Sequence, residues 1–109
     1  MNNNSWQNKN EEGQLSLDVF EKGKYIIIKS TIAGVKPEDL EININNDLIT
    51  IRGERRLEEK SEIKNWLYQE CFWGKFSRSI VLPVEVKVNQ AKVSLKNGIL
   101  TIVLPKANG

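Results

Sequence analysis

The sequence has no histidine and a single cysteine, Cys71. The absence of histidine removes the most common general base and the most common metal ligand. One cysteine cannot form a thiolate zinc site or an intrachain disulfide, and no C-x-x-C or H-E-x-x-H motif is present. We therefore expect no metal, no cofactor and no enzymatic activity. We also expect Cys71 to be a small buried hydrophobic residue.

Motifs for phosphates, nucleic acids and membranes are also missing. Gly34, Gly53 and Gly74 stand apart and form neither a G-x-G-x-x-G nor a Walker pattern. The net charge is only +2, with acidic and basic residues interleaved, which predicts no nucleic-acid binding. No apolar run approaches the roughly 20 residues of a membrane span, and the first 14 residues lack the apolar core of a signal peptide. With the lone cysteine, these features predict a cytoplasmic protein.

What the sequence does contain is apolar residues that alternate with polar ones in short segments. This period-2 pattern predicts strands, and turn residues separate the segments. Ile26, Ile28, Ile32, Ile49 and Ile51 are expected to face the core. The expected strands cover residues 15–19, 25–33, 40–44, 48–52, 66–73, 76–82, 91–96 and 99–104. About eight short strands in 109 residues predict one β-sandwich or barrel domain.

Local turn chemistry refines this prediction. Asn97-Gly98 suits a two-residue type I′ turn, which predicts a hairpin between the last two strands. Residues 99–104 are apolar on both faces, so we expect that strand to be buried on each side. Pro37-Glu38-Asp39 could start one helical turn, but the apolar period that follows is two and predicts a strand. The aromatic residues Trp66, Tyr68, Phe72, Trp73 and Phe76 favour core and sheet packing over a stacking platform for sugars or bases.

The charged segment 53–65 is ambiguous. Its composition favours a solvated helix, and Arg55 and Glu59 stand four residues apart. Leu57 and Ile63 are its only apolar anchors, and strands flank it on both sides. A long excursion of this kind in a compact β domain is usually functional or flexible. The residues alone leave helix and loop open.

Four stretches, in order, resemble the α-crystallin domain of the small heat-shock proteins. Residues 91–106 read A-x-x-x-x-x-N-G-I-L-T-I-x-L-P-K, and V-K-P-E-D-L-E-I follows Ala33-Gly34. Residues 48–55 read L-I-T-I-R-G-E-R, and residues 68–83 read Y-Q-E-x-F-W-G-K-F-S-R-S-I-x-L-P, with Arg78 at the family's prominent arginine. Cys71-Phe72-Trp73 departs from the family, which more often carries arginine or polar residues there.

The resemblance implies an all-β, immunoglobulin-like antiparallel β-sandwich with an exchanged dimerisation strand or loop. The domain is expected at residues 15–106, after a short polar arm at 1–14 that contains Trp6. Residues 107–109 are expected to be a stub without the family's Ile-x-Ile tail. The segment before Trp66 would cross to a partner subunit and pair with its first strand, forming a homodimer or a larger oligomer. The expected dimer-interface residues are Leu15, Leu17, Val19, Leu57, Ile63 and Arg78.

Arg78 shares a strand face with Phe76, Ile80 and Leu82. A guanidinium in such apolar surroundings needs hydrogen-bonding partners. We therefore expect carboxylate or backbone-carbonyl partners near or across the dimer interface.

The activity implied by the resemblance is that of an ATP-independent holdase, which binds partly unfolded client proteins and prevents their aggregation. A groove for Ile-x-Ile tails or client segments is expected between two strands; its residues are Leu40, Ile42, Ile44, Ala91, Val93 and Leu95. The alternative for these residues is that they are simply inward core positions. The alternative function is a p23-like β-sandwich co-chaperone or adaptor module, and a third, carbohydrate binding, rests on the tryptophans alone.

Overall fold

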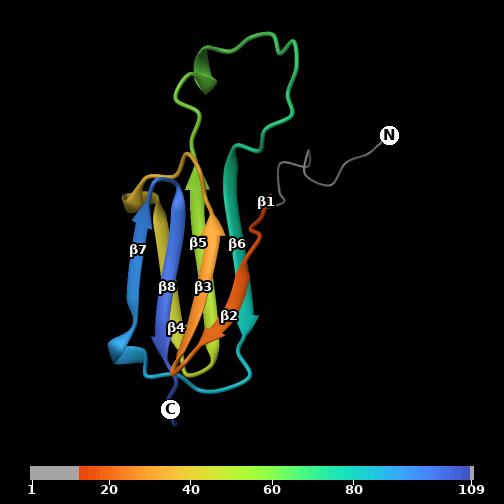
Figure 1. Cartoon of the computed structure of the whole chain (residues 1–109). Helices are drawn as coiled ribbons and strands as arrows, with labels where there is room; N and C mark the ends of the chain where they lie inside the picture. The colour runs from red at the N-terminus through yellow and green to blue at the C-terminus, as the bar shows by residue number, and fades with distance from the viewer. Residues whose placement is uncertain (1–12, 109) are drawn as a thin grey trace.

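The structure, a computed structural model, describes residues 13–108, which form two four-stranded β-sheets packed face to face (Figure 1). One sheet has the strand order β1-β6-β5-β4 and the other β2-β3-β8-β7. The strands are β1 (Gly13–Gln14), β2 (Asp18–Lys22), β3 (Tyr25–Thr31), β4 (Leu40–Asn45), β5 (Leu48–Arg55), β6 (Gly74–Val81), β7 (Lys92–Lys96) and β8 (Ile99–Pro105). Pairing among them is antiparallel except for the short parallel contact of β1 with β6. The predicted all-β, immunoglobulin-like sandwich is confirmed.

Three short 3-10 turns connect the described strands: η2 (Pro37–Asp39), η3 (Lys60–Glu62) and η4 (Val88–Gln90). The first is the helical turn that Pro37 could start, and the expected strand, β4, follows it. The predicted arm at 1–14, including Trp6, falls outside the described residues except for Gly13 and Gln14, and so does Gly109 of the predicted stub.

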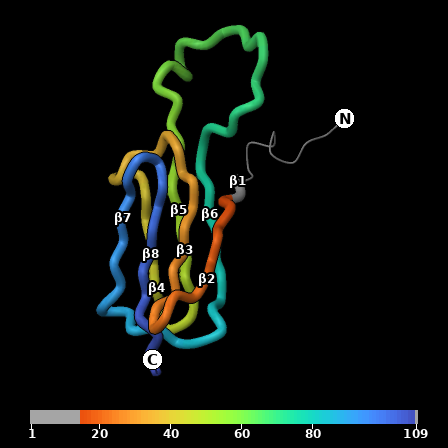
Figure 2. The backbone as a smooth tube through the Cα atoms, viewed as in Figure 1, coloured from red at the N-terminus to blue at the C-terminus, as the bar shows by residue number. Residues whose placement is uncertain are grey.

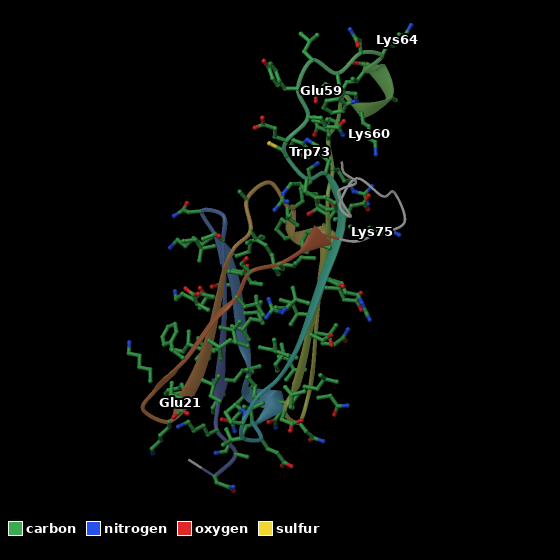
Figure 3. The ribbon with its side chains drawn as sticks, turned by 90° about the vertical axis from the view of Figure 1, so that its right-hand side faces the viewer. Glu21, Glu59, Lys60, Lys64, Trp73 and Lys75 are labelled. Carbon is green, nitrogen blue, oxygen red and sulfur yellow. The ribbon has the colours of Figure 1, made fainter. Side chains whose placement is uncertain are left out.

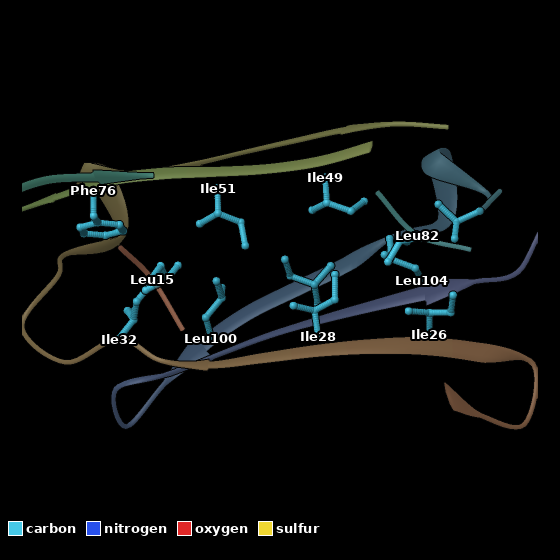
Figure 4. Packing of buried hydrophobic residues seen from close by; sticks show 12 residues of the cluster. Leu15, Ile26, Ile28, Ile32, Ile49, Ile51, Phe76, Leu82, Leu100 and Leu104 are labelled. Carbon is cyan, nitrogen blue, oxygen red and sulfur yellow. The ribbon is translucent and has the colours of Figure 1, made fainter. Parts of the chain in front are cut away.

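The core lies between the two sheets and is made of alternate residues of each strand. Figure 4 shows Ile49, Ile51 and Phe76 of one sheet pointing toward Ile28 and Leu100 of the other. Within residues 13–108 the buried cluster consists of Leu15, Ile26, Ile28, Ile32, Ile49, Ile51, Phe76, Leu82, Val86, Leu100, Ile102 and Leu104. Burying one such side chain contributes about 1.5–3 kcal/mol. The period-2 pattern therefore predicted the core faces of β3 and β5 correctly.

The hairpin of β7 and β8 turns as predicted. Asn97 and Gly98 have φ of 54° and 77°, the left-handed conformation that a type I′ turn requires at both positions. The carbonyl oxygen of Gly98 also accepts a hydrogen bond from the amide of Ile32, at 2.7 Å. The turn thereby ties the end of this hairpin to the residue that follows β3.

The predicted first strand, 15–19, is wrong in its first half. β2 begins at Asp18, and residues 15–17 cross from the β6 side of one sheet to the β2 edge of the other. The buried Ser30 hydroxyl donates to the carbonyl oxygen of Ser16 at 2.8 Å, and Arg78 Nη1 donates to that of Leu15 at 2.7 Å. These backbone carbonyls thus bond to one side chain from each sheet. Leu15 and Leu17 alternate as in a strand because they close the side of the sandwich.

The predicted strand at 66–73 is also wrong. β5 ends at Arg55, which pairs with Gly74 at the start of β6, so residues 56–73 extend beyond the last rung of the sheet. We call this segment the excursion; Figure 2 shows it projecting from one end of the sandwich. No strand lies beside it in the described chain, and η3 is its only regular element. Helix propensity also failed here, since the segment is a loop.

Two burial predictions need correction. Cys71 lies in the excursion and is exposed, because the two sheets and the core between them end before this segment. β8 is not buried on both faces: Leu100, Ile102 and Leu104 are buried, whereas Ile99 is exposed and Val103 is half-buried. No further layer of the described chain covers the outer side of this sheet.

Candidate functional site

The six predicted groove residues lie on β7, on β4 and just before β7, and each of these strands is the last of its sheet. The register places Ile42 opposite Ile51 and Ile44 opposite Ile49, so the β4 row faces inward. Val93 lies opposite the buried Ile102, so the β7 row faces inward as well. Both rows therefore line the same open side of the sandwich. We call this set, Leu40, Ile42, Ile44, Ala91, Val93 and Leu95, the edge groove.

The edge groove is only partly covered by the rest of the chain. Leu40, Ile42 and Ile44 are half-buried against the core, as are Ala91 and Leu95. Val93 is 48% exposed although its side chain points inward. The two sequence-based alternatives, groove residues and inward core residues, thus describe the same positions. Binding of a peptide there stays a prediction.

The predicted interface residues fall into two groups that the single chain does not bring together. Leu15, Leu17, Val19 and Arg78 lie along the β2 and β6 side of the sandwich. β2 is exposed along its whole length, and no described strand pairs with its outer edge. Leu57 and Ile63 lie in the excursion, which continues past the end of the sandwich (Figure 2).

Arg78 has the backbone-carbonyl partner that the sequence predicted. Its strand register, opposite Ile51, directs it toward the interior, but the side chain reaches the open side of the sandwich and bonds to Leu15. No carboxylate contacts it among residues 13–108. A guanidinium bonded to one carbonyl retains donors for further acceptors.

The excursion carries most of the exposed apolar surface at its end of the molecule. Leu67 and Tyr68 are 85% and 86% exposed, and Trp66 is also exposed. Figure 3 shows Glu59, Lys60 and Lys64 at the far end of the molecule from Glu21, with Trp73 nearer the sandwich. The expectation that the aromatic cluster packs into the core is wrong for Trp66 and Tyr68. It is right for Phe76, which lies on β6 within the sandwich.

Arg55 holds the base of the excursion, and the sequence prediction missed this role. Its Nε donates to the carbonyl oxygen of Ala33 at 2.7 Å, and its Nη1 donates to that of Phe72 at 3.3 Å. The guanidinium also lies over the Phe76 ring, 5.8 Å from the centroid. The signal was available: Ile49, Ile51, Gly53 and Arg55 share one face of β5, so Arg55 had to point inward.

A shallow pocket next to η2 is lined by side chains of both charge signs. Arg56 pairs there with Asp39 at 3.1 Å and with Glu54 at 3.2 Å. The hydrogen bond from Arg56 to Asp39, reinforced by the charges of Asp39 and Glu54, raises the pKa of Arg56 above its ordinary value.

No group of three or more metal-binding side chains occurs in the described part of the chain. The same residues include no helix long and apolar enough to cross a membrane.

The sequence model of the Hsp20/alpha crystallin family matches residues 8–109, almost the whole chain. The chain belongs to this family. The family assignment agrees with the two-sheet architecture and with the four sequence stretches that resembled the α-crystallin domain. It does not favour the p23-like alternative.

Individual relatives agree with the family assignment. The 17.5 kDa class I heat shock protein of Glycine max is 38% identical over 81 residues, which are 73% of this chain and 53% of the relative. Heat shock protein 16.0 of Schizosaccharomyces pombe has a TM-score of 0.80 at 33% identity, covering 88% of this chain and 89% of that one. A small heat-shock protein of Xylella fastidiosa has a TM-score of 0.74 at 26% identity, with 84% of each chain covered. The chain spans about half the length of the curated relatives it matches.

Proposed function

We propose that this chain is an ATP-independent holdase of the small heat-shock type, which binds partly unfolded proteins and keeps them from aggregating. The observation that carries the proposal is the edge groove, an inward-facing apolar row on each of two edge strands that no described strand covers. Exposed apolar segments of an unfolding client gain free energy when such a surface removes them from water. The function requires no catalysis, and the lone cysteine supports a cytoplasmic location.

The proposed mode of binding at the edge groove is addition of an extended segment. The outer edges of β4 and β7 have backbone groups that no described strand pairs with, and these can bond to an added strand. Alternate side chains of that strand would enter between Ile42 or Ile44 on one side and Val93 or Leu95 on the other. An Ile-x-Ile segment, a client segment or a partner's chain would each satisfy this geometry.

The proposed assembly is a homodimer in which each excursion pairs with β2 of the other copy, and larger oligomers can be built from it. The outer edge of β2 pairs with no strand of residues 13–108, and an edge of this kind is an aggregation hazard. A reciprocal exchange would cover it. The same exchange would bury Leu57, Ile63 and part of the apolar surface at Trp66 and Leu67. The similar small heat-shock protein of Xylella fastidiosa is described as having a distinct high order structure.

Two measurements test these proposals separately. A client that aggregates on heating should scatter less light when the chain is added without ATP. Light scattering should give the mass of a dimer at about tens of micromolar protein, a concentration suited to a weak or moderate interface. The double variant Leu57→Asp, Ile63→Asp should shift the mass to a monomer, whereas Glu59→Gln, on an exposed excursion position, should not. A dimer without client protection contradicts the holdase proposal; a monomeric parent contradicts the exchange.

A further inference from the structure

The outer face of the β2-β3-β8-β7 sheet combines exposed apolar residues with lysines. The register aligns Phe20, Ile27 and Val103 in one row across β2, β3 and β8. Tyr25 and Pro105 form the next row, paired directly with each other. These side chains point away from the core, because their strand neighbours Ile26, Ile28, Ile102 and Leu104 are buried.

Lysines surround this apolar centre. Lys22 lies opposite Tyr25, and Lys92 lies opposite Val103. Lys29 lies in the next row, opposite Thr101, and Lys96 lies one row further, opposite Ile99. Asp18 is the one acidic side chain directed outward on the strands of this sheet. Lys29 bonds to Thr101 at 3.3 Å, and Lys22, Lys92 and Lys96 form no ion pair with any described residue. We call the apolar centre with its four lysines the basic face.

The opposite outer face of the sandwich differs from the basic face. It presents hydroxyl and amide groups in its middle, such as the Thr50 and Ser79 pair at 3.2 Å. Its exposed apolar residues are Leu48 and Val81, which lie opposite each other near the end of the sheet. The residue beside Leu48 in that row is the uncharged Asn45, whereas a lysine ends each of the two apolar rows of the basic face. Its cations, Arg52 and Lys75, lie opposite the acidic residues Glu41 and Glu54. No aromatic residue is directed outward on its strands, so aromatics and unpaired cations occur together on one face only of the described sandwich.

We propose that the basic face binds an anionic lipid surface, with Phe20 and Tyr25 entering the interface and the lysines contacting phosphate groups. Phe20 and Tyr25 are 41% and 45% exposed, so the rings are available without unfolding. Aromatic rings are favoured at the boundary between headgroups and acyl chains, and lysine side chains extend from there to the phosphates. The charge of the face complements an anionic bilayer.

The backbone arrangement favours a lipid surface over a peptide. β3 and β8 lie inside the sheet, and their backbone groups pair with neighbours on both sides. A peptide strand laid on this face would find no backbone partner there. The outer edges of β4 and β7, by contrast, pair with no other described strand. A flat bilayer needs only side-chain contacts. The proposed dimer adds its strand beside β2, in the plane of the sheet, and so leaves the basic face open.

The test is sedimentation of the full chain with vesicles of phosphatidylglycerol and phosphatidylcholine, compared with vesicles of phosphatidylcholine alone. Binding should require the anionic lipid and weaken as ionic strength rises from about 0.1 M to about 1 M, where the Debye length falls from about 10 Å to about 3 Å. Lys22→Gln and Lys92→Gln should each lower the partition coefficient about fivefold, as expected near a membrane surface for one lysine.

Two double variants complete the test. Phe20→Ser with Tyr25→Ser should lower vesicle binding at least about tenfold, since the rings supply the apolar contact. Leu48→Ser with Val81→Ser, the matched change on the opposite face, should leave binding as in the parent. Equal losses in both double variants, or no binding to anionic vesicles, would overturn the proposal. Binding to polyglutamate or single-stranded poly(dT) without binding to vesicles would overturn it as well. If the aromatic double variant fails to fold, the lysine variants decide, and the proposal is overturned if they bind vesicles like the parent.

Discussion

Gly53 of β5 lies directly opposite Phe76 of β6, and the phenylalanine ring covers the glycine. A Cβ atom at position 53 would lie 2.5 Å from Cζ of Phe76 and 3.0 Å from the carbonyl oxygen of Asp39. Glycine is therefore required by space and not by backbone conformation. The G-E-R stretch of the sequence begins with glycine because the Phe76 ring occupies the space that a side chain at position 53 would need.

Replacing Gly53 with alanine should destabilise the fold. Overpacking of this kind costs about 1–3 kcal/mol, because either the ring or the η2 backbone must move. Thermal or urea unfolding of Gly53→Ala measures the loss. In the double variant Gly53→Ala, Phe76→Leu the smaller leucine side chain leaves room for the added methyl group. The double variant should therefore lose less stability than the sum of the losses of the two single variants. An unchanged melting temperature in Gly53→Ala would show that the ring is not held over the glycine.

Arg55→Met should loosen the excursion without unfolding the sandwich. The change removes the hydrogen bonds to Ala33 and Phe72 while keeping most of the side-chain volume. Residues 56–73 should then become more sensitive to proteolysis, and amide exchange should rise near Phe72. Arg52→Met is the control, because Arg52 lies on the outer face of the same strand. If both variants are cut at the same rate, Arg55 does not hold the excursion.

Arg78→Gly should lower stability and favour aggregation. The variant leaves the Leu15 carbonyl without its partner on the open side of the sandwich, which costs about 1 kcal/mol after allowance for exposure. It also removes the charge that we place in the dimer interface. Arg78→Lys should retain part of the stability, since a lysine can donate one bond. A variant that melts and elutes from a sizing column like the parent would reduce Arg78 to a solvated surface charge.

The edge groove should bind an Ile-x-Ile peptide in a saturable way. Val93→Asp should lower the affinity at least about tenfold, which corresponds to 1.4 kcal/mol for a charge placed among apolar groups. Ser94→Asp is the matched control, because Ser94 is next to Val93 on β7 and points to the outer face. Titration of a labelled peptide measures both. Absence of binding at about 1 mM peptide, the weakest affinity of interest, would leave these residues only a core role.

The sequence predicted the fold where alternation coincided with a neighbouring strand. Ile26 and Ile28, or Ile49 and Ile51, alternate in strands that pair on both sides, so the local pattern and the tertiary structure agree. The stretch from Trp66 to Phe72 has a similar pattern, but no described strand lies beside it. Alternation with period 2 indicates only that one face of an extended segment is apolar. It does not report whether a partner strand is present.

The errors at the candidate site have related causes. Free cysteines are usually buried, which predicts an interior position for Cys71. Its exposure follows from its place beyond the end of the sheet, which local sequence does not indicate. Leu15 is apolar and alternates with Leu17, and this local pattern predicts a strand. Its carbonyl oxygen instead bonds to Arg78, a residue far away in the sequence, where Leu15 closes the side of the sandwich. The bonds of Arg55 also join residues far apart in sequence. The motifs located strands β4 and β7 correctly, because they contain whole strands and their turns.

The pairing of Arg55 with Gly74 places the two ends of the excursion side by side. Lengthening a loop whose ends are already adjacent costs little, about 0.6 kcal/mol for each doubling of its length. Insertions and substitutions between these residues can therefore accumulate over evolution while the core stays intact. In the exchange that we propose, two diverged copies of such a gene in one cell would assemble or remain separate according to differences in this segment alone.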